Sequence, residues 1–321
     1  MPDINSGLGG RVPVMRDLRG ILCTLALMPA LAFAQPSRTQ IVMLGTGTPI
    51  PDPDRSGPAV AIIVDSVAYL FDAGAGVMRR AVTAGRNGVR AFAPRNATGQ
   101  AATQFDRLFL THLHSDHTLG LADVIFTPWI QGRRAPLDIY GPPGTKHLVS
   151  GILDANSEDI AERIAASGGP SPEGWNSVVH EITEGVVFKD SRITVRAFAV
   201  PHAGWKYAFG YRVETPDRTI VISGDTRADS GIAEHCRGCD VLIHEVYSDS
   251  GFATLPPARQ SYHSNAHTSA TNLGDIATRA RPRLLILYHQ LFFGATGEKL
   301  LSEVRSRFGG RVVSAHDLAV Y

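Results

Sequence analysis

One short segment, LFLTHLHSDHTLG (residues 108–120), constrains the fold and the chemistry of this chain more than any other. It places His112, His114, Asp116 and His117 directly after an apolar run that is typical of a buried strand. Alternate residues of extended backbone point to the same side, so the first three of these side chains converge. Four nitrogen and oxygen ligands are too many for one four-coordinate metal that keeps an open position. The segment therefore predicts two adjacent metal ions rather than an incidental cluster of surface histidines.

Two metals would need further ligands at the ends of other strands. Three candidates close apolar runs, namely His202 in FAVPHAG, Asp225 in VISGDT and His289 in LILYHQ. A sheet fixes residues at strand ends, while the surrounding loops shape access to them. Asp225 is a carboxylate and can bridge two cations. Each of the three could be an ordinary surface residue if taken alone, but together with the first cluster they complete a set of ligands.

The rest of the chain predicts alternating strands and helices from Thr39 onward. The strand-like runs are rich in β-branched residues and are separated by Gly, Pro and Asp. The order is strand-rich, helical, strand-rich, helical, and two mixed sheets packed face to face with helices outside would satisfy it. The expected helices cover 74–86, 117–129, 145–166, 268–280 and 296–307, and the expected loops cover 86–104 and 167–177.

These motifs, in this order, resemble the metallo-β-lactamase-fold hydrolases. MLGTGTP, LFDAGAG, THLHSDHTLGL, SGDT and LIHE are similar to the ribonuclease Z-like and arylsulfatase-like branch, and the resemblance covers nearly all of the mature chain. It implies an α/β fold, an αββα four-layer sandwich with the metals at one edge. The implied cofactors are two Zn²⁺, with Mn²⁺ or Fe²⁺ as alternatives. The resemblance assigns one metal to His112, His114 and His202, the second to Asp116, His117 and His289, and the bridge to Asp225.

Other polar residues are candidates for roles beside the metals. Asp72 in FDAG either orients a ligand histidine through its other ring nitrogen or caps the following helix. His244 and Glu245 in VLIHE either relay protons or form a buried, satisfied pair. The resemblance gives His267 a part in proton transfer, with capping by the two residues after it as the alternative. Asp116 is expected to act in catalysis as well as in metal binding.

The N-terminus has the order of a secretory signal peptide. Arg16 and Arg19 precede a short apolar run, and Ala32-Phe33-Ala34 follows as a small-x-small cleavage site. We expect residues 1–34 to be removed before Gln35, which leaves residues 35–321 as a periplasmic or secreted hydrolase domain with no membrane segment. A buried N-terminal helix is the alternative. Cys236 and Cys239 remain in the mature chain, either as a disulfide or as two free thiols.

The expected reaction is ester hydrolysis, in which two cations lower the pKa of a shared water. We expect a small phosphate or sulfate ester as the substrate, with a ribonuclease Z-type endonuclease or a lactone or carboxylic ester hydrolase as the alternatives. Removing residues 1–34 takes away three arginines and two aspartates, so the 31 basic and 30 acidic residues become equal in number and the mature chain has no net charge. A chain without net positive charge attracts RNA only weakly, so nucleic acid is not expected as a substrate. His202 and Asp225 are only 23 positions apart (225 − 202), which leaves no room for the extended arm of bacterial ribonuclease Z enzymes.

A noncatalytic scaffold is the competing class, but such a protein would typically have lost a ligand, and all seven candidates are present. The sequence leaves a homodimer open. Two sets of residues have open roles. Arg133 and Arg134 either reach the mouth of the site or lie in a solvated turn. The aromatic residues either wall an apolar pocket beside the ions or belong to the core; they are Trp129, Trp205, Phe292 and Phe293.

Overall fold

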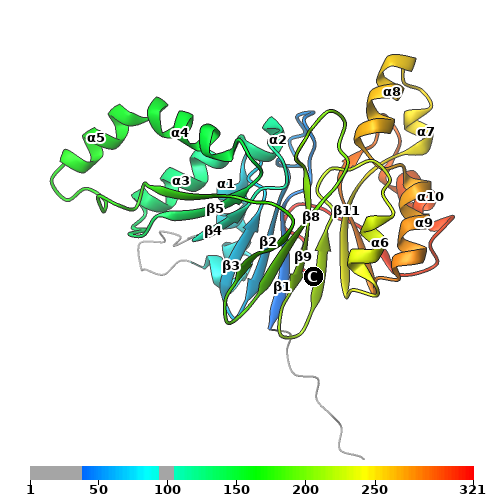
Figure 1. Ribbon diagram of the computed structural model, residues 1–321, viewed down its shortest axis with the longest axis horizontal. Helices are drawn as coiled ribbons and strands as arrows, with labels where there is room; N and C mark the ends of the chain where they lie inside the picture. Colours follow the sequence, from blue (N-terminus) through cyan, green and yellow to red (C-terminus); the bar gives the residue numbers. More distant parts are fainter. Residues whose placement is uncertain (1–37, 94–104) are drawn as a thin grey trace, which may run out of the picture. The chain divides into compact units, whose positions relative to one another are not determined.

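The computed structural model describes residues 38–93 and 105–321, which form two mixed β-sheets with helices on their outer faces (Figure 1). The first sheet has the order β1-β2-β3-β4-β5-β6, antiparallel from β1 to β3 and parallel from β3 to β6. Its strands are β1 (Thr39–Gly45), β2 (Ala59–Val64), β3 (Val67–Phe71), β4 (Arg107–Phe109), β5 (Leu137–Gly141) and β6 (Ser177–Glu181).

The second sheet has the order β13-β12-β11-β10-β9-β8-β7, antiparallel from β7 to β10 and parallel from β10 to β13. Its strands are β7 (Gly185–Lys189), β8 (Thr194–Ala199), β9 (Phe209–Glu214), β10 (Thr219–Ile222), β11 (Val241–Tyr247), β12 (Leu284–Leu291) and β13 (Val312–Ser314). The segment that follows β13 pairs with β1, because the backbone N–H of Ile41 donates to the carbonyl of Tyr321 at 3.0 Å.

Two groups of helices cover the sheets. Those that belong to the first half of the chain are α1 (Val77–Arg86), the 3₁₀ turn η1 (Arg90–Phe92), α2 (Ser115–Thr118), α3 (Leu121–Ile130), α4 (Thr145–Ala155) and α5 (Ser157–Ala165). Those that belong to the second half are α6 (Gly231–Cys236), α7 (Asp249–Phe252), α8 (Pro257–Ala266), α9 (Ala270–Ala280) and α10 (Gly297–Arg305).

Three hydrophobic clusters separate these layers. One lies between the sheets and includes Phe109 and Ile243. The second packs the first sheet against α1 and α3, and the third packs the second sheet against α6, α9 and α10. Successive strand residues face opposite sides of a sheet, and on β11 Ile243 belongs to the first cluster while Leu242 belongs to the third. The predicted αββα four-layer sandwich is therefore confirmed.

Several elements differ from the sequence-based expectation. The stretch 145–166 forms two helices that meet at Asn156 instead of one. Strands β6 and β7 were not predicted, because they are half-exposed edge strands whose side chains do not alternate cleanly between apolar and polar. Helices α6, α7 and α8 were also missed. The predicted signal peptide of residues 1–34 lies outside the described residues, as do positions 94–104 of the predicted surface loop.

The two cysteines of the predicted mature chain form a disulfide. Cys236 ends α6 and is bonded to Cys239, with both side chains buried. Of the two alternatives that the sequence left open, the structure therefore shows the disulfide. Within residues 38–93 and 105–321, no helix has the length and apolar character that crossing a membrane requires.

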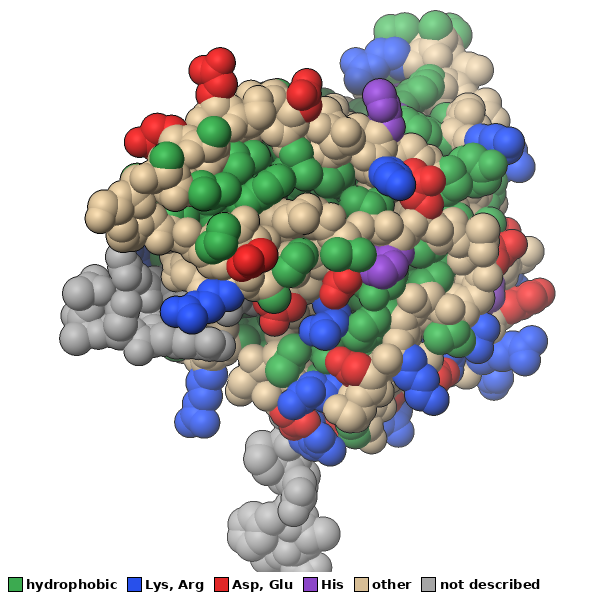
Figure 2. All heavy atoms as spheres, turned by 60° about the vertical axis from the view of Figure 1, so that its left-hand side comes forward, with side chains coloured by type: hydrophobic (Ala, Val, Ile, Leu, Met, Phe, Trp, Pro, Cys, Tyr) green, Lys and Arg blue, Asp and Glu red, His purple; other side chains and the backbone are tan. Residues whose placement is uncertain are grey.

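Figure 2 shows the face of the molecule that carries α4 and α5. Hydrophobic side chains gather there, and Lys and Arg are interspersed with Asp and Glu instead of forming a continuous basic surface. A hollow of ≈ 750 Å³ lies between α4, α5 and β6, and its lining includes Leu153, Ile160 and Trp175.

Candidate metal centre

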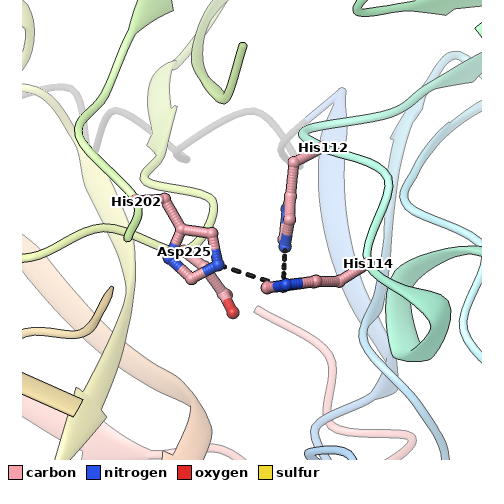
Figure 3. Close-up of side chains that lie close together, drawn as sticks. All are labelled: His112, His114, His202 and Asp225. Carbon is pink, nitrogen blue, oxygen red and sulfur yellow. Dashed lines mark hydrogen bonds between the residues drawn. The ribbon is translucent and has the colours of Figure 1, made fainter. Parts of the chain in front are cut away.

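Histidines from two distant parts of the chain meet at one edge of the sandwich (Figure 3). His112 and His114 follow β4, and His202 follows β8. Nδ1 of His114 lies 3.0 Å from Nε2 of His112 and 3.1 Å from Nε2 of His202. Asp225, after β10, belongs to the same group, in which one ligand atom from each residue lies within 4.8 Å of the others. Three imidazoles and a carboxylate in this arrangement suit a divalent cation such as zinc.

A second cluster lies beside the first. Asp116 and His117 are on α2, and His289 is on β12. Oδ2 of Asp116 lies 3.2 Å from Nε2 of His289 and 3.6 Å from Nε2 of His117. All three side chains are buried, and their ligand atoms lie within 4.8 Å of one another. This set can also hold a divalent cation.

Asp225 belongs to the first cluster and also lies beside the second. Its Oδ1 lies 3.5 Å from Nε2 of His117, and its Oδ2 lies 3.4 Å from Nε2 of His289. Neither Oδ1 of Asp225 nor Nε2 of His117 has a hydrogen-bond partner, although both are buried. Buried polar atoms without partners raise the free energy of the folded state. A cation between these atoms would satisfy both, so the residues present fit the metals that the sequence predicted.

Unusual backbone conformations place two of these ligands. His289 has a φ of +42° and is the extra residue of a bulge where β12 pairs with β11. Bulges redirect side chains, so His289 lies within its strand and not at its end as expected from the sequence. Gly224, before Asp225, has a φ of +61°, and a Cβ there would lie 2.6 Å from the carbonyl oxygen of Phe209. The turn that presents Asp225 therefore requires glycine.

Asp72 orients two of the ligand histidines. Its Oδ2 accepts hydrogen bonds from Nδ1 of His117 at 2.8 Å and from the hydroxyl of Thr111 at 2.9 Å. The Thr111 hydroxyl oxygen lies 2.9 Å from Nδ1 of His112. These contacts hold Nε2 of both rings toward the clusters. The N-cap residue of α1 is Gly76 and no side chain caps this helix, so Asp72 hydrogen-bonds a candidate ligand histidine and does not cap α1.

Glu245 fixes the two loops that flank Asp225. Its Oε1 accepts hydrogen bonds from the backbone N–H of Thr268 at 2.8 Å and of Thr226 at 3.4 Å. Its Oε2 lies 3.4 Å from Nδ1 of His267. The carboxyl is fully buried. Glu245 thus lies next to the ligands, as expected for a residue that supports them.

The two histidines predicted to transfer protons lie in different surroundings. Nδ1 of His267 lies 3.8 Å from Oδ2 of Asp225. Ser269, one of the two residues named for capping, does cap α9, so capping and a place for His267 beside the ligands occur together. His244 and Glu245 are neighbours on β11, so their side chains face opposite sides of the sheet. Nδ1 of His244 donates a hydrogen bond to the backbone carbonyl of Glu245. In the described part of the chain, no hydrogen bond or ion pair joins His244 to a ligand candidate. His267 therefore lies beside the ligand candidates. The predicted proton relay through His244 is not supported by any contact between His244 and a ligand candidate among the described residues.

Burial and neighbouring charges shift the pKa values of the ligands in opposite directions. Burial, followed by the positive charge of His117, lowers the pKa of His112 well below its usual range. Burial acts to raise the pKa of Asp225, but His289 and His117 outweigh it and hold that pKa well below the usual range. At neutral pH His112 is therefore neutral and Asp225 is ionised, which are the forms that bind a metal cation.

Both predictions for Arg133 were wrong. Its side chain is 2% exposed, and its guanidinium donates to the carbonyl oxygens of Val124, Ile125 and Gly174. Pro128 lies inside α3 and has no N–H to donate to the carbonyl of Val124, so Arg133 supplies the missing donor. Arg133 thus joins α3 to the segment before β6 and brings no charge to the metal centre.

Of the four aromatic residues with open roles, Trp205 contacts a ligand candidate. Its indole Nε1 lies 2.6 Å from Nε2 of His114. Trp129 is fully buried, so of the two alternatives that the sequence left open, the core is the one that the structure shows. Phe292 and Phe293 line a different hollow of ≈ 470 Å³, together with the loop from Gly47 to Arg55. The single aromatic pocket that the sequence offered as an alternative is therefore not formed.

Sequence reasoning missed three features beside the centre. The first is the hydroxyl of Thr111, which contacts Nδ1 of His112 and donates to the carboxylate of Asp72. Thr111 directly precedes the histidine motif, and this position was the available sign of its role. The loop from Thr48 to Gly57 lines a hollow of ≈ 670 Å³ that reaches Asp116. Its composition, TPIPDPDRSG, was the available sign of a loop that shapes a site. Helix α8 contributes Tyr262, which lines a hollow together with His202.

Comparison with known proteins identifies the family. Residues 68–290 match the family model described as the β-lactamase superfamily domain. The chain belongs to this superfamily. It is a hydrolase of the metallo-β-lactamase fold, and the predicted resemblance to the ribonuclease Z-like branch is confirmed.

Relatives and solved structures agree with this membership. The chain is 32% identical to "Ribonuclease Z" of Mycobacterium bovis BCG Pasteur over 287 residues, which cover 87% of this chain and 96% of the relative. Among solved structures, it resembles YhfI of Bacillus subtilis (TM-score 0.63, 18% identity, 89% of this chain and 100% of the other). It also resembles the short form of human tRNase Z, with a TM-score of 0.61 and 23% identity over 88% of this chain and 98% of the other. A diphosphatase of the PhnP family is similar as well, with a TM-score of 0.59 and 19% identity over 88% of this chain and 97% of the other.

Proposed function

We propose that this metallo-β-lactamase-fold hydrolase cleaves phosphodiesters with two divalent cations, zinc in the first place. The observation that carries the proposal is the pair of ligand clusters that share Asp225. His112, His114 and His202 would hold one cation, and Asp116, His117 and His289 would hold the other. When bound, such a pair supplies a water of lowered pKa and offsets negative charge on a phosphoryl oxygen.

The chain's own residues do the positioning. Asp72 and Thr111 set the orientation of the ligand rings, and Glu245 holds the loops on either side of Asp225. His267 is our candidate for moving a proton to or from the reacting groups, because its ring nitrogen lies between Asp225 and Glu245 at the centre.

The first substrate that we propose is an RNA phosphodiester, cleaved as in the ribonuclease Z reaction. The relatives of this chain that carry that name are matched along nearly their whole length. This support outweighs the arguments from charge and chain spacing that favoured a small phosphate or sulfate ester and made nucleic acid unexpected. Precursor transfer RNA is therefore the substrate to test first.

A small phosphodiester is the second candidate, and one observation favours it. Between His202 and Asp225 the chain has room only for β9, β10 and their short connections. An extended RNA-binding arm is therefore absent from this part of the described chain. Without such an arm, contacts to a large RNA would depend on other surfaces.

One comparison of rates tests the proposal. The purified protein is assayed at equal concentration on precursor transfer RNA, bis(p-nitrophenyl) phosphate and p-nitrophenyl sulfate, with and without added zinc. We expect position-specific RNA cleavage with kcat/KM above that for the small diester. Turnover of the small diester alone would favour the second candidate, and turnover of the sulfate alone would contradict phosphodiester hydrolysis.

Replacing Asp72 by asparagine is expected to weaken zinc binding by about 10–100-fold, the usual loss when a residue that orients a ligand is changed. The amide keeps the size of the side chain but cannot accept hydrogen bonds at both oxygens as the carboxylate does. Competition with a chelator measures the zinc Kd. Asp65→Asn, at an exposed carboxylate, is the matched control. Equal affinities in the two variants would contradict the orienting role of Asp72.

We also propose that the protein is exported and begins at Gln35 after cleavage. The basic, apolar and small-x-small order of the N-terminus supports this, and so does the disulfide between Cys236 and Cys239, since disulfides persist mainly outside the cytosol. N-terminal sequencing of the periplasmic or secreted protein is expected to start at Gln35. Full-length protein recovered only from the cytosol would contradict export.

A further inference from the structure

We infer that a hollow beside the first ligand cluster binds a nucleobase of the substrate. The inference rests on the proposed phosphodiester hydrolysis and adds which part of the substrate the chain recognises. The hollow measures ≈ 620 Å³, and its lining includes His202, Trp205, Arg227, Tyr262 and Asn265. Small-molecule sites commonly have volumes of about 300–1,000 Å³. We call it the Trp205–Tyr262 hollow.

Two aromatic rings are exposed at this hollow. Trp205 is 37% exposed and Tyr262 is 48% exposed, whereas large aromatic side chains are usually buried. Aromatic side chains stack on the faces of nucleobases, and this contact tolerates different base sequences because every base has a π-face. Exposed rings that line one hollow next to a ligand histidine are therefore suited to a base attached to the reacting phosphate.

Hydrogen bonds hold the two walls of the Trp205–Tyr262 hollow together. The backbone N–H of Ala203 donates to the carbonyl of Asn265 at 3.0 Å. Nδ1 of His202 lies 2.7 Å from the carbonyl oxygen of Ala266 and donates to it. The loop that carries Trp205 is thus fixed to the end of α8, which carries Tyr262. A base bound here would have a fixed position relative to His202.

One cation, Arg227, lines the same hollow, and a second, Lys206, is next to Trp205 in the sequence. Arg227 is exposed, and among the described residues none forms an ion pair or a hydrogen bond with its guanidinium. Lys206 follows Trp205, and its Nζ lies 5.0 Å from the centre of the Tyr207 ring. Aromatic rings beside positive charges are the combination that binds single-stranded nucleic acid, since the cations attract the phosphates and the rings stack on the bases.

The neighbouring hollow beside Asp116 is a poorer place for a base. Aliphatic and proline side chains dominate its lining, which includes Ile50 and Leu119. Nη1 of Arg55 already donates to Thr46 and to the carbonyl of Ala315, which directs part of this guanidinium toward the protein. The base is therefore assigned to the Trp205–Tyr262 hollow.

Metal loading and the Trp205 ring are coupled. The indole N–H can only donate, so Nε2 of His114 accepts the hydrogen bond between them. When Nδ1 of His114 binds a cation, the ring proton of a neutral imidazole resides on Nε2, where it faces the indole N–H. Two donors cannot share a hydrogen bond, so the indole is released from His114. Zinc addition is thus expected to change the fluorescence of Trp205.

A matched pair of substrates tests the subsite. Thymidine 5′-(p-nitrophenyl phosphate) and its abasic analogue have the same leaving group and the same sugar, and differ only in the base. We expect the zinc-loaded protein to prefer the thymidine ester, and Trp205→Ala to reduce that preference by about tenfold, the loss of one base–aromatic stack. Trp205→Phe should restore most of the preference. Trp175→Ala, which removes an indole from the hollow between α4, α5 and β6, should leave it unchanged.

The outcomes separate the subsite from the proposed function. Equal kcat/KM for the two esters in the unchanged protein, or equal losses on both esters in Trp205→Ala, would overturn the subsite while phosphodiester hydrolysis stands. Failure to cleave either ester, and precursor RNA as well, would overturn the proposed function. Zinc content is measured for every variant, and a fluorescence change on zinc addition that persists in Trp205→Phe would contradict the coupling between Trp205 and His114.

Discussion

Replacing Asp225 by alanine is expected to lower kcat/KM for every phosphodiester substrate by more than about 100-fold, because even residues that only orient a ligand cost about 10–100-fold. The carboxylate is 2% exposed and belongs to the cluster of His112, His114 and His202. Its two oxygens also lie 3.5 and 3.4 Å from His117 and His289 of the second cluster. Its loss removes the shared ligand and leaves these histidines without the negative charge between them. The purified variant should also contain less zinc than the parent protein, in which we expect close to two equivalents.

The matched control is Asp275→Ala, at an exposed carboxylate on α9. It removes the same side chain from the same half of the chain and should change neither zinc content nor kcat/KM. A variant at Asp225 that folds, keeps two zinc equivalents and retains the parent activity would contradict the shared role of this carboxylate. A protein that holds a single zinc with full activity would contradict the two-metal proposal itself.

The ligand positions could be predicted because they follow simple local rules. His112 and His114 alternate after an apolar strand, and His202 and Asp225 follow other apolar strands. Asp116 was expected to continue the alternation, but it lies on helix α2 and joins the second cluster. The sheets then bring these strand ends to one edge. The four-layer fold could be predicted for a similar reason, because the apolar runs that form its central strands are long and nearly uninterrupted.

Features that depend on contacts between distant residues could not be predicted. The bulge at His289 is a property of how β12 pairs with β11, which no single strand encodes. The contact between Trp205 and His114 joins residues 91 positions apart. Edge strands such as β6 were missed because exposure on the sheet edge removes the apolar pattern that identifies a strand. Tertiary contacts thus decide which polar and aromatic residues join the centre.

Arg133 illustrates this limit, because a charged residue in a polar stretch was expected at the surface. Its guanidinium donates to the carbonyl oxygens of four buried residues, namely Phe105, Val124, Ile125 and Gly174. The carbonyl of Val124 has no helical donor, because Pro128 lacks an N–H. Burial lowers the pKa of Arg133 to about 10, which leaves the guanidinium charged at neutral pH. The charge is tolerated because charge-assisted hydrogen bonds to the carbonyls replace those to water.

Replacing Arg133 by alanine is therefore expected to lower the free energy of unfolding by about 3 kcal/mol or more, since each buried carbonyl left without a donor costs about 1–3 kcal/mol. The neighbouring Arg134 is exposed, and Arg134→Ala should change stability by less than about 0.5 kcal/mol. Guanidinium denaturation followed by circular dichroism measures both. Because Arg133 is buried away from the ligand clusters, the folded fraction of Arg133→Ala should keep the zinc content of the parent protein. Similar denaturation midpoints for the two variants would show that water replaces the lost donors and that Arg133 does not hold α3 in place.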